Sequence, residues 1–224
     1  MRVSGKNVFN ELDLTKVRKV YLSNSFKDQE ILKKIKDNSL KYVLTDAKVM
    51  DKIAPHNQGI IVEINDYVYG TLNDINDSDN YVLILDHLED PHNFGAIIRS
   101  CEARGVKHII IPKDRSVIVN ETVMKISTGA LANVNVIMVS NLVNAINCLK
   151  DKGFFIYAAE ADGVDYRKVD YADKVCLVIG SEGFGLSRLV RDNSDVIISI
   201  PMKGHVNSLN ASVSAGILLF GIGE

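Results

Sequence analysis

The sequence lacks several features that would assign it to a familiar class. Its three cysteines, Cys101, Cys148 and Cys176, lie far apart and form no CxxC pair. We therefore expect neither a disulfide framework nor a bound metal, and interpret them as core thiols. No apolar run approaches the length of a membrane span, and the polar opening MRVSGKNVFNELDLTK has no signal-peptide core. We expect a cytoplasmic protein without a membrane partner.

Two widespread nucleotide-binding patterns are also missing. The chain contains neither GxGxxG nor GxxxxGK[ST], so an NAD-type or P-loop assignment fails on spacing. There are no internal repeats or low-complexity tracts. Hydrophobic residues make up 46% of the chain and charged residues 24%, which argues for a globular protein and against disorder.

Charge is distributed unevenly along the chain. Residues 1–68 carry 12 Lys and Arg against 9 Asp and Glu, whereas the whole chain has a net charge of -2. This modestly basic N-terminal region could bind phosphates. A Lys-rich helix face such as Lys33, Lys34 and Lys36 can equally be a solvent-exposed surface with no ligand.

A polar segment divides the chain into two regions. Residues 69–80 lie in a stretch rich in Asn, Asp and Gly, which indicates a linker. Before it, the patterns predict helices at 28–37 and 47–53 and strands at 42–44 and 59–64, a small α/β module. We assign residues 1–68 to a first domain and residues 81–224 to a second.

The second region repeats an apolar β-branched run, a polar loop and a helical pattern. Uninterrupted apolar runs predict strands buried on both faces, and hence a parallel sheet covered by helices. Ligands bind beyond the carboxyl ends of such strands, which directs attention to the loops after Asp86, Gly180 and Pro201. The predicted strands are residues 81–86, 108–112, 135–139, 154–160, 175–180 and 196–201.

The first loop, DHLEDPHN, leads into a helix that begins near Asn93 and ends at Gly105. Phe94, Ile97 and Ile98 recur at helical spacing and would face the core, whereas Arg99 projects away from that stripe. Asn93 can be a helix cap and Arg99 a surface cation, or both can serve a site.

The second and third loops are GSEGFG and PMKGHVNSLN. Three glycines allow close approach of the backbone to a ligand, while Glu182 can also be only an exposed turn residue. A final helix is expected from near Ser208, with Leu209, Val213, Ile217 and Phe220 on one apolar face and small residues elsewhere. The NSLN turn offers donors to a ligand, although capping alone would also explain it.

Together, DPHNFGAIIRSCEARGV, LVIGSEGFGLSRL and ISIPMKGHVNSLNASVSAGILLF resemble the three motifs of the SpoU (TrmH) family of RNA ribose methyltransferases, in the SPOUT superfamily. GKNVFNEL and HNQGIIVEI are similar to the N-terminal L30e-like substrate-binding domain of two-domain members. The resemblance implies an α/β fold, with a mostly parallel SPOUT domain closed by a C-terminal trefoil knot, a homodimer, and S-adenosyl-L-methionine as cofactor.

The resemblance also assigns roles to individual residues. Arg99 is the main catalytic candidate, and because a guanidinium is a poor base at neutral pH we expect it to stabilise the developing alkoxide. Asn93, Glu182, Ser208 and Asn210 match the other active-site positions. The expected cofactor-binding residues are Gly180, Glu182, Gly183, Ile200, Pro201, Met202, Ser208 and Leu209.

The implied reaction is methylation of a ribose 2′-hydroxyl in structured RNA. The two-domain form most resembles members that modify a guanosine of large-subunit (23S-type) rRNA, and tRNA is the alternative substrate. Two other readings stay open: a catalytically silent RNA-binding protein of the same fold, and another α/β enzyme with a nucleotide cofactor.

Overall fold

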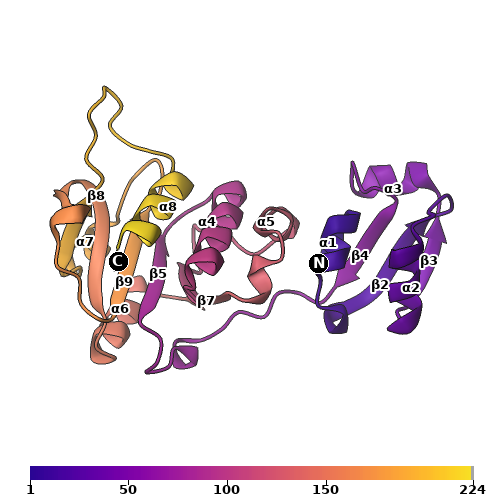
Figure 1. Ribbon diagram of the computed structural model, residues 1–224, viewed down its shortest axis with the longest axis horizontal. Coiled ribbons are helices and arrows are strands. Elements are labelled where there is room, and N and C mark those ends of the chain that lie inside the picture. Colours follow the sequence, from indigo (N-terminus) through magenta and orange to yellow (C-terminus); the bar gives the residue numbers. More distant parts are fainter. Residues whose placement is uncertain (223–224) are drawn as a thin grey trace. The chain divides into compact units, whose positions relative to one another are not determined.

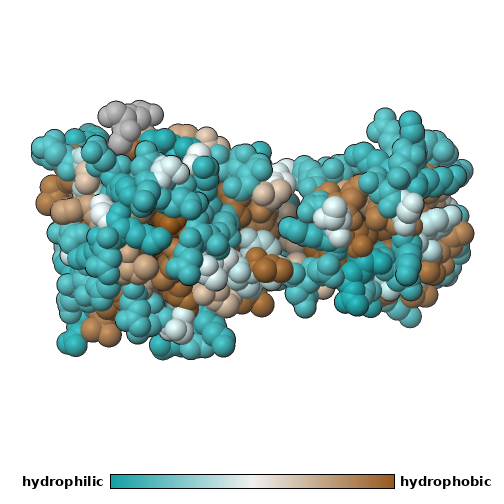
Figure 2. All heavy atoms as spheres, turned by 90° about the horizontal axis from the view of Figure 1, so that it is seen from below, coloured by the Kyte–Doolittle hydropathy of each residue, from teal (hydrophilic) through white to brown (hydrophobic). Residues whose placement is uncertain are grey.

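The computed structural model describes residues 1–222, which form two compact units (Figure 1). Unit 1 comprises Met1–Val68 and Val119–Ala132, and unit 2 comprises Tyr69–Ile118 and the described residues from Asn133 onward. Each unit has its own hydrophobic core. On the face drawn in Figure 2 the surface is mostly hydrophilic, with hydrophobic side chains scattered over it.

Unit 1 contains a four-stranded sheet in the order β1-β4-β2-β3. β4 is antiparallel to both β1 and β2, whereas β3 runs parallel to β2. The predicted helix at 28–37 forms because Asp28 accepts a hydrogen bond from the Ile31 amide and because Ile31 and Ile35, one turn apart, are buried. The elements are β1 (Arg2–Ser4), α1 (Lys6–Glu11), β2 (Val17–Ser23), α2 (Gln29–Asp37), β3 (Tyr42–Thr45), α3 (Ala47–Ile53), β4 (Ile60–Ile64) and α5 (Glu121–Ser127).

Unit 2 is built on a six-stranded sheet in the order β10-β8-β9-β5-β6-β7, and every neighbouring pair is parallel. The central strands are buried on both faces, which confirms the predicted parallel sheet. Its strands are β5 (Tyr81–Asp86), β6 (His108–Pro112), β7 (Asn135–Val139), β8 (Phe155–Asp165), β9 (Val175–Gly180) and β10 (Val196–Ser199). Its helices are α4 (Pro91–Arg104), α6 (Leu142–Asp151), α7 (Arg188–Asp192) and α8 (Ala211–Gly221).

The segment 69–80 packs onto unit 2 and does not have the character of a linker. Gly70 donates a hydrogen bond to the Val136 carbonyl, and Ile75 is buried in the unit 2 core. Asp79 is buried and its Oδ2 lies 3.0 Å from Nε2 of His108. Polar composition predicted a connector here, but one isoleucine and these hydrogen bonds hold it against the sheet.

The segment 119–132 lies, by sequence, inside the predicted second domain and yet belongs to unit 1. Met124 packs against the unit 1 core, and Ser4 donates a hydrogen bond of 2.9 Å to Glu121. Pairings this distant along the chain leave no local signal in the sequence.

β8 is interrupted where it meets β10. Ile197 of β10 pairs with Ala158 of β8, but the next residue, Ile198, pairs with Val164. Residues 159–163 therefore have no partner on β10, although Ala159 still pairs with Ile179 of β9, and they form a bulge at the edge of the sheet where β5 and β9 end.

The final helix begins later than expected, and its apolar face was assigned wrongly. Asn210 caps α8, so Ser208 and Leu209 precede the helix. The residues buried inside are Ala211, Ala215, Leu218 and Leu219, whereas Val213 is 49% and Phe220 44% exposed. Two alanines and two leucines form the internal face, and the alanines allow α8 to pack closely against α4 and β9.

Candidate functional site

A buried carboxylate joins the first two predicted loops. Asp86 ends β5, and in the sheet register it lies opposite Gly180 at the end of β9. Its Oδ2 accepts a hydrogen bond of 2.6 Å from the Ser187 amide, and its Oδ1 lies 2.5 Å from Nδ1 of His87. A carboxylate buried in this way is stabilised by such donors, so the loops after β5 and β9 are held together.

The loop after β9 is a tight hairpin. Ser181 and Gly185 exchange two backbone hydrogen bonds of 3.0 and 2.9 Å, which leave Glu182, Gly183 and Phe184 at the tip. A Cβ on Gly180 would lie 2.3 Å from the carbonyl carbon of Gly185, so only glycine fits there.

Three side chains connect all three motifs. Asn210 donates a hydrogen bond of 3.0 Å from Nδ2 to Oδ1 of Asn93, and Asn93 donates one from Nδ2 to Oε1 of Glu182. Asn93 is buried, and Asp90 rather than Asn93 caps α4. The capping explanation for Asn93 is therefore not supported, and the buried amide serves to link the loops.

The first cavity, named here the Ile200 cavity, lies between the loops after β8, β9 and β10 and the start of α8. Its volume is about 260 Å³. Isoleucine, leucine, methionine and alanine side chains form most of its wall, and Glu160 and Glu182 add carboxylates. Of the residues predicted to bind a cofactor, Gly180, Glu182, Ile200, Met202, Ser208 and Leu209 line it.

Two residues of that set lie elsewhere. Pro201 is exposed and is not part of the Ile200 cavity, and Gly183 lines a neighbouring cavity instead. Pro201 comes two residues after the end of β10, beyond the part of the loop that the sheet orients.

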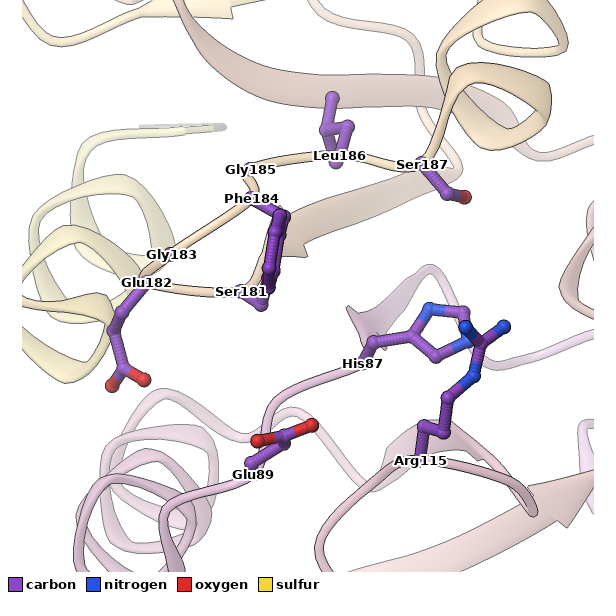
Figure 3. A pocket seen from close by; sticks show the side chains of 10 residues that line it. All are labelled: His87, Glu89, Arg115, Ser181, Glu182, Gly183, Phe184, Gly185, Leu186 and Ser187. Carbon is purple, nitrogen blue, oxygen red and sulfur yellow. The ribbon is translucent and has the colours of Figure 1, made fainter.

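The second cavity, named here the His87 cavity, has a volume of about 340 Å³ (Figure 3). His87 and Glu89 come from the loop after β5, Arg115 from the loop after β6, and the rest from residues 181–187. Ser181, Glu182 and Gly185 line both cavities, so the hairpin is a wall common to the two.

Arg99 lies outside the lining of both cavities. It is exposed on α4, as the sequence predicts, and within residues 1–222 its guanidinium forms no hydrogen bond or ion pair. Its five donors are therefore available to a molecule that approaches from solvent.

Sequence reasoning missed the loop within β8. Ala159, Glu160 and Ala161 line the Ile200 cavity, and Glu160 is ion-paired with Arg191, which also binds Asp162 at 2.8 Å. The sequence did contain a signal for this loop. Ligands bind beyond the carboxyl ends of parallel strands, and the predicted strand 154–160 also ends at that edge of the sheet.

Other chemistries find little support in the described part of the chain. Burial raises the pKa of the Cys101 and Cys176 thiols, which disfavours a thiolate nucleophile at either position. Among residues 1–222, no group of three or more His, Cys, Asp and Glu side chains is placed to hold a metal ion. No described helix combines the length and apolar character needed to cross a membrane.

Comparisons with known proteins agree with this geometry. Residues 80–220 match the model of the SpoU rRNA Methylase family. A Staphylococcus aureus protein named TrmH family tRNA/rRNA methyltransferase is 42% identical over 97% of this chain and 93% of its own length. The AdoMet-bound rRNA methyltransferase of Sinorhizobium meliloti superposes with a TM-score of 0.81 at 25% identity, covering 98% of this chain and 85% of that one. The SpoU methyltransferase AviRb of Streptomyces viridochromogenes, also solved with AdoMet, has a TM-score of 0.83 at 21% identity, with 99% and 88% covered.

Proposed function

The chain belongs to the SpoU rRNA methylase family, and from this premise we propose that it transfers a methyl group from S-adenosylmethionine to a ribose 2′-hydroxyl of structured RNA. The observation that carries the proposal is the hydrogen-bonded series Asn210, Asn93 and Glu182, which joins residues from all three motifs and ends at Glu182 in the lining of the Ile200 cavity. The substrate we favour is a guanosine of large-subunit rRNA. A tRNA ribose is the second candidate, because relatives are named for both RNAs.

The Ile200 cavity suits S-adenosylmethionine chemically. Apolar walls and backbone groups of the loops can hold an adenine, as in other concave, mostly apolar sites. The carboxylates of Glu160 and Glu182 suit a ligand with a sulfonium and an ammonium group. When bound, this cofactor supplies an activated methyl group. Gly180, Ile200 and Leu209 are the positions proposed to contact it through the backbone.

The remaining site residues position the loops and the acceptor. Asn93, Glu182 and Asn210 fix the distance between the cofactor loop and α4, and Ser208 borders the Ile200 cavity. Such positioning can supply on the order of 7 kcal/mol of the acceleration of an in-line displacement. Arg99 is the proposed electrostatic stabiliser of the alkoxide that develops as the hydroxyl loses its proton.

The family resemblance adds three features to the proposal. Unit 1 is taken as an L30e-like RNA-binding domain, in keeping with the basic character of residues 1–68. The C-terminal region is taken to form a trefoil knot. The active form is taken to be a homodimer, and the exposed apolar stripe of Val213 and Phe220 on α8 supports this, because it has no cover within the described chain.

The role of Arg99 can be tested directly. We expect Arg99→Ala to bind S-adenosylmethionine with nearly unchanged affinity by calorimetry but to reduce turnover on RNA by at least about 100-fold, the scale of losing one electrostatic stabiliser. Arg99→Lys keeps the charge but not the planar donor set and should recover only part of the rate. Wild-type turnover in the alanine variant would refute the assignment.

A further inference from the structure

The proposed function uses the Ile200 cavity and assigns no ligand to the adjoining His87 cavity. The cavity is about 340 Å³, within the range of roughly 300–1,000 Å³ typical of small-molecule sites. It meets the Ile200 cavity along Ser181, Glu182 and Gly185. In-line transfer needs the acceptor next to the donor, and a ligand in the His87 cavity would lie beside one in the Ile200 cavity because the two linings share these residues.

Phe184 is the most unusual side chain in this cavity. It is 95% exposed at the tip of the hairpin, between Gly183 and Gly185. Figure 3 shows its ring directed from the hairpin toward the side of the cavity formed by His87, Glu89 and Arg115. The hairpin is held by its own backbone hydrogen bonds and by the hydrogen bond from Ser187 to Asp86, so the backbone that carries the ring is anchored. An exposed aromatic ring on a hydrogen-bonded hairpin is a platform on which an unstacked nucleobase can lie.

A guanidinium and an imidazole stand on the opposite side. Arg115 and His87 line the cavity from separate loops, and both have left-handed backbone conformations, with φ of 49° and 59°. Such conformations are costly for residues other than glycine and occur preferentially at binding sites. Within residues 1–222 the Arg115 guanidinium forms no hydrogen bond or ion pair. An unpaired guanidinium in a cavity matches the geometry of a phosphate.

The cavity also contains an acidic group. The Glu89 carboxylate is exposed in the same lining. It would repel a phosphate nearby, so an anion must bind at the Arg115 side. The carboxylate can accept hydrogen bonds from N–H groups on the edge of a base.

We propose that the His87 cavity binds the nucleotide carrying the acceptor hydroxyl, with its base stacked on Phe184 and a phosphate of the RNA paired with Arg115. The proposal rests on the RNA methyltransferase function inferred above and adds where the substrate binds. Phe184 and Arg115 contact substrate and not the cofactor, so their loss should leave cofactor binding intact.

The experiment compares Phe184→Ala with Phe184→Tyr in methyl transfer to unmodified transcripts of large-subunit rRNA and tRNA. We expect Phe184→Ala to lower kcat/KM by about tenfold or more, the scale of losing one stacked base, and Phe184→Tyr to retain most of it. Calorimetry should give both variants wild-type affinity for S-adenosylmethionine. Leu189→Ala, another exposed apolar residue near the hairpin but outside both cavities, is the matched control and should change nothing.

A salt titration tests the phosphate contact without catalysis. RNA affinity is measured by fluorescence anisotropy with fluorescently labelled forms of the same transcripts. Arg115→Ala should reduce the slope of log affinity against log salt by about 0.7–1, which corresponds to one phosphate contact. Arg188→Ala, exposed and outside both cavities, should keep the wild-type slope.

The outcomes separate the two claims. If wild-type protein methylates neither transcript, the proposed function fails. If it methylates one of them and Phe184→Ala and Arg115→Ala behave like wild type, the function stands and the substrate assignment of the His87 cavity is overturned.

Discussion

Gly180 at the end of β9 and Gly183 in the hairpin that follows it lie three residues apart and obey different constraints. A Cβ on Gly180 would collide with the backbone of Gly185 and Leu186, whereas a Cβ on Gly183 would meet no heavy atom within 4 Å. From sequence, both glycines looked alike as cofactor-loop residues. The structure separates a glycine required by packing from one that is required only if a ligand approaches it closely.

This difference predicts contrasting variants. Gly180→Ala should open the hairpin and weaken S-adenosylmethionine binding by at least about tenfold, since a backbone displacement of 1 Å at a site carries a cost of this order or larger. Gly183→Ala should bind the cofactor with wild-type affinity, because Gly183 lies outside the Ile200 cavity. Calorimetry on both proteins is the measurement, and equal loss of affinity in the two would show that Gly183 also contacts the cofactor.

At the scale of elements, the strands were the most predictable part of the fold. Uninterrupted apolar runs such as residues 81–86 and 175–180 gave both the positions of the strands and the parallel sheet. The bulge after Ala158 was not predictable, because it depends on which residues of β10 pair with β8. The orientation of α8 could not be predicted from the sequence either, because the helix is apolar on nearly every side and its residues do not show which face packs inward.

The segment 69–80 offers a test at this scale. Ile75→Ala removes a fully packed side chain from the unit 2 core, and we expect it to lower the free energy of unfolding by about 2–5 kcal/mol. Val68→Ala, at a position 84% exposed, should change it by less than about 0.5 kcal/mol. Chemical denaturation distinguishes the two, and an equally small effect of both substitutions would mean that the segment behaves as a linker in solution.

At the scale of the whole molecule, sequence motifs predicted a shared site and the structure brings Asn93, Glu182 and Asn210 together. The His87 cavity was not predicted, because Arg115 reaches it from a loop that carries none of the three motifs. Residues 119–132 join unit 1 through contacts with distant partners. What escaped prediction in each case was tertiary pairing between segments far apart in the chain.

The proposed homodimer makes a prediction about assembly. Placing a charge in the apolar stripe, as in the double variant Val213→Asp and Phe220→Asp, should convert a dimer to a monomer in sedimentation experiments, because a buried unpaired carboxylate is costly. Leu189→Asp, also at an exposed apolar position, should remain dimeric. A wild-type protein that sediments as a monomer at micromolar concentration would contradict the dimer.

The measurement that tests the central claim most directly is mass spectrometry of nucleosides from unmodified rRNA and tRNA transcripts incubated with the protein and S-adenosylmethionine carrying an isotopically labelled methyl group. The account predicts that the label appears on the ribose of one nucleoside, as a 2′-O-methyl group. Label on a base, or no label in either RNA, would contradict it.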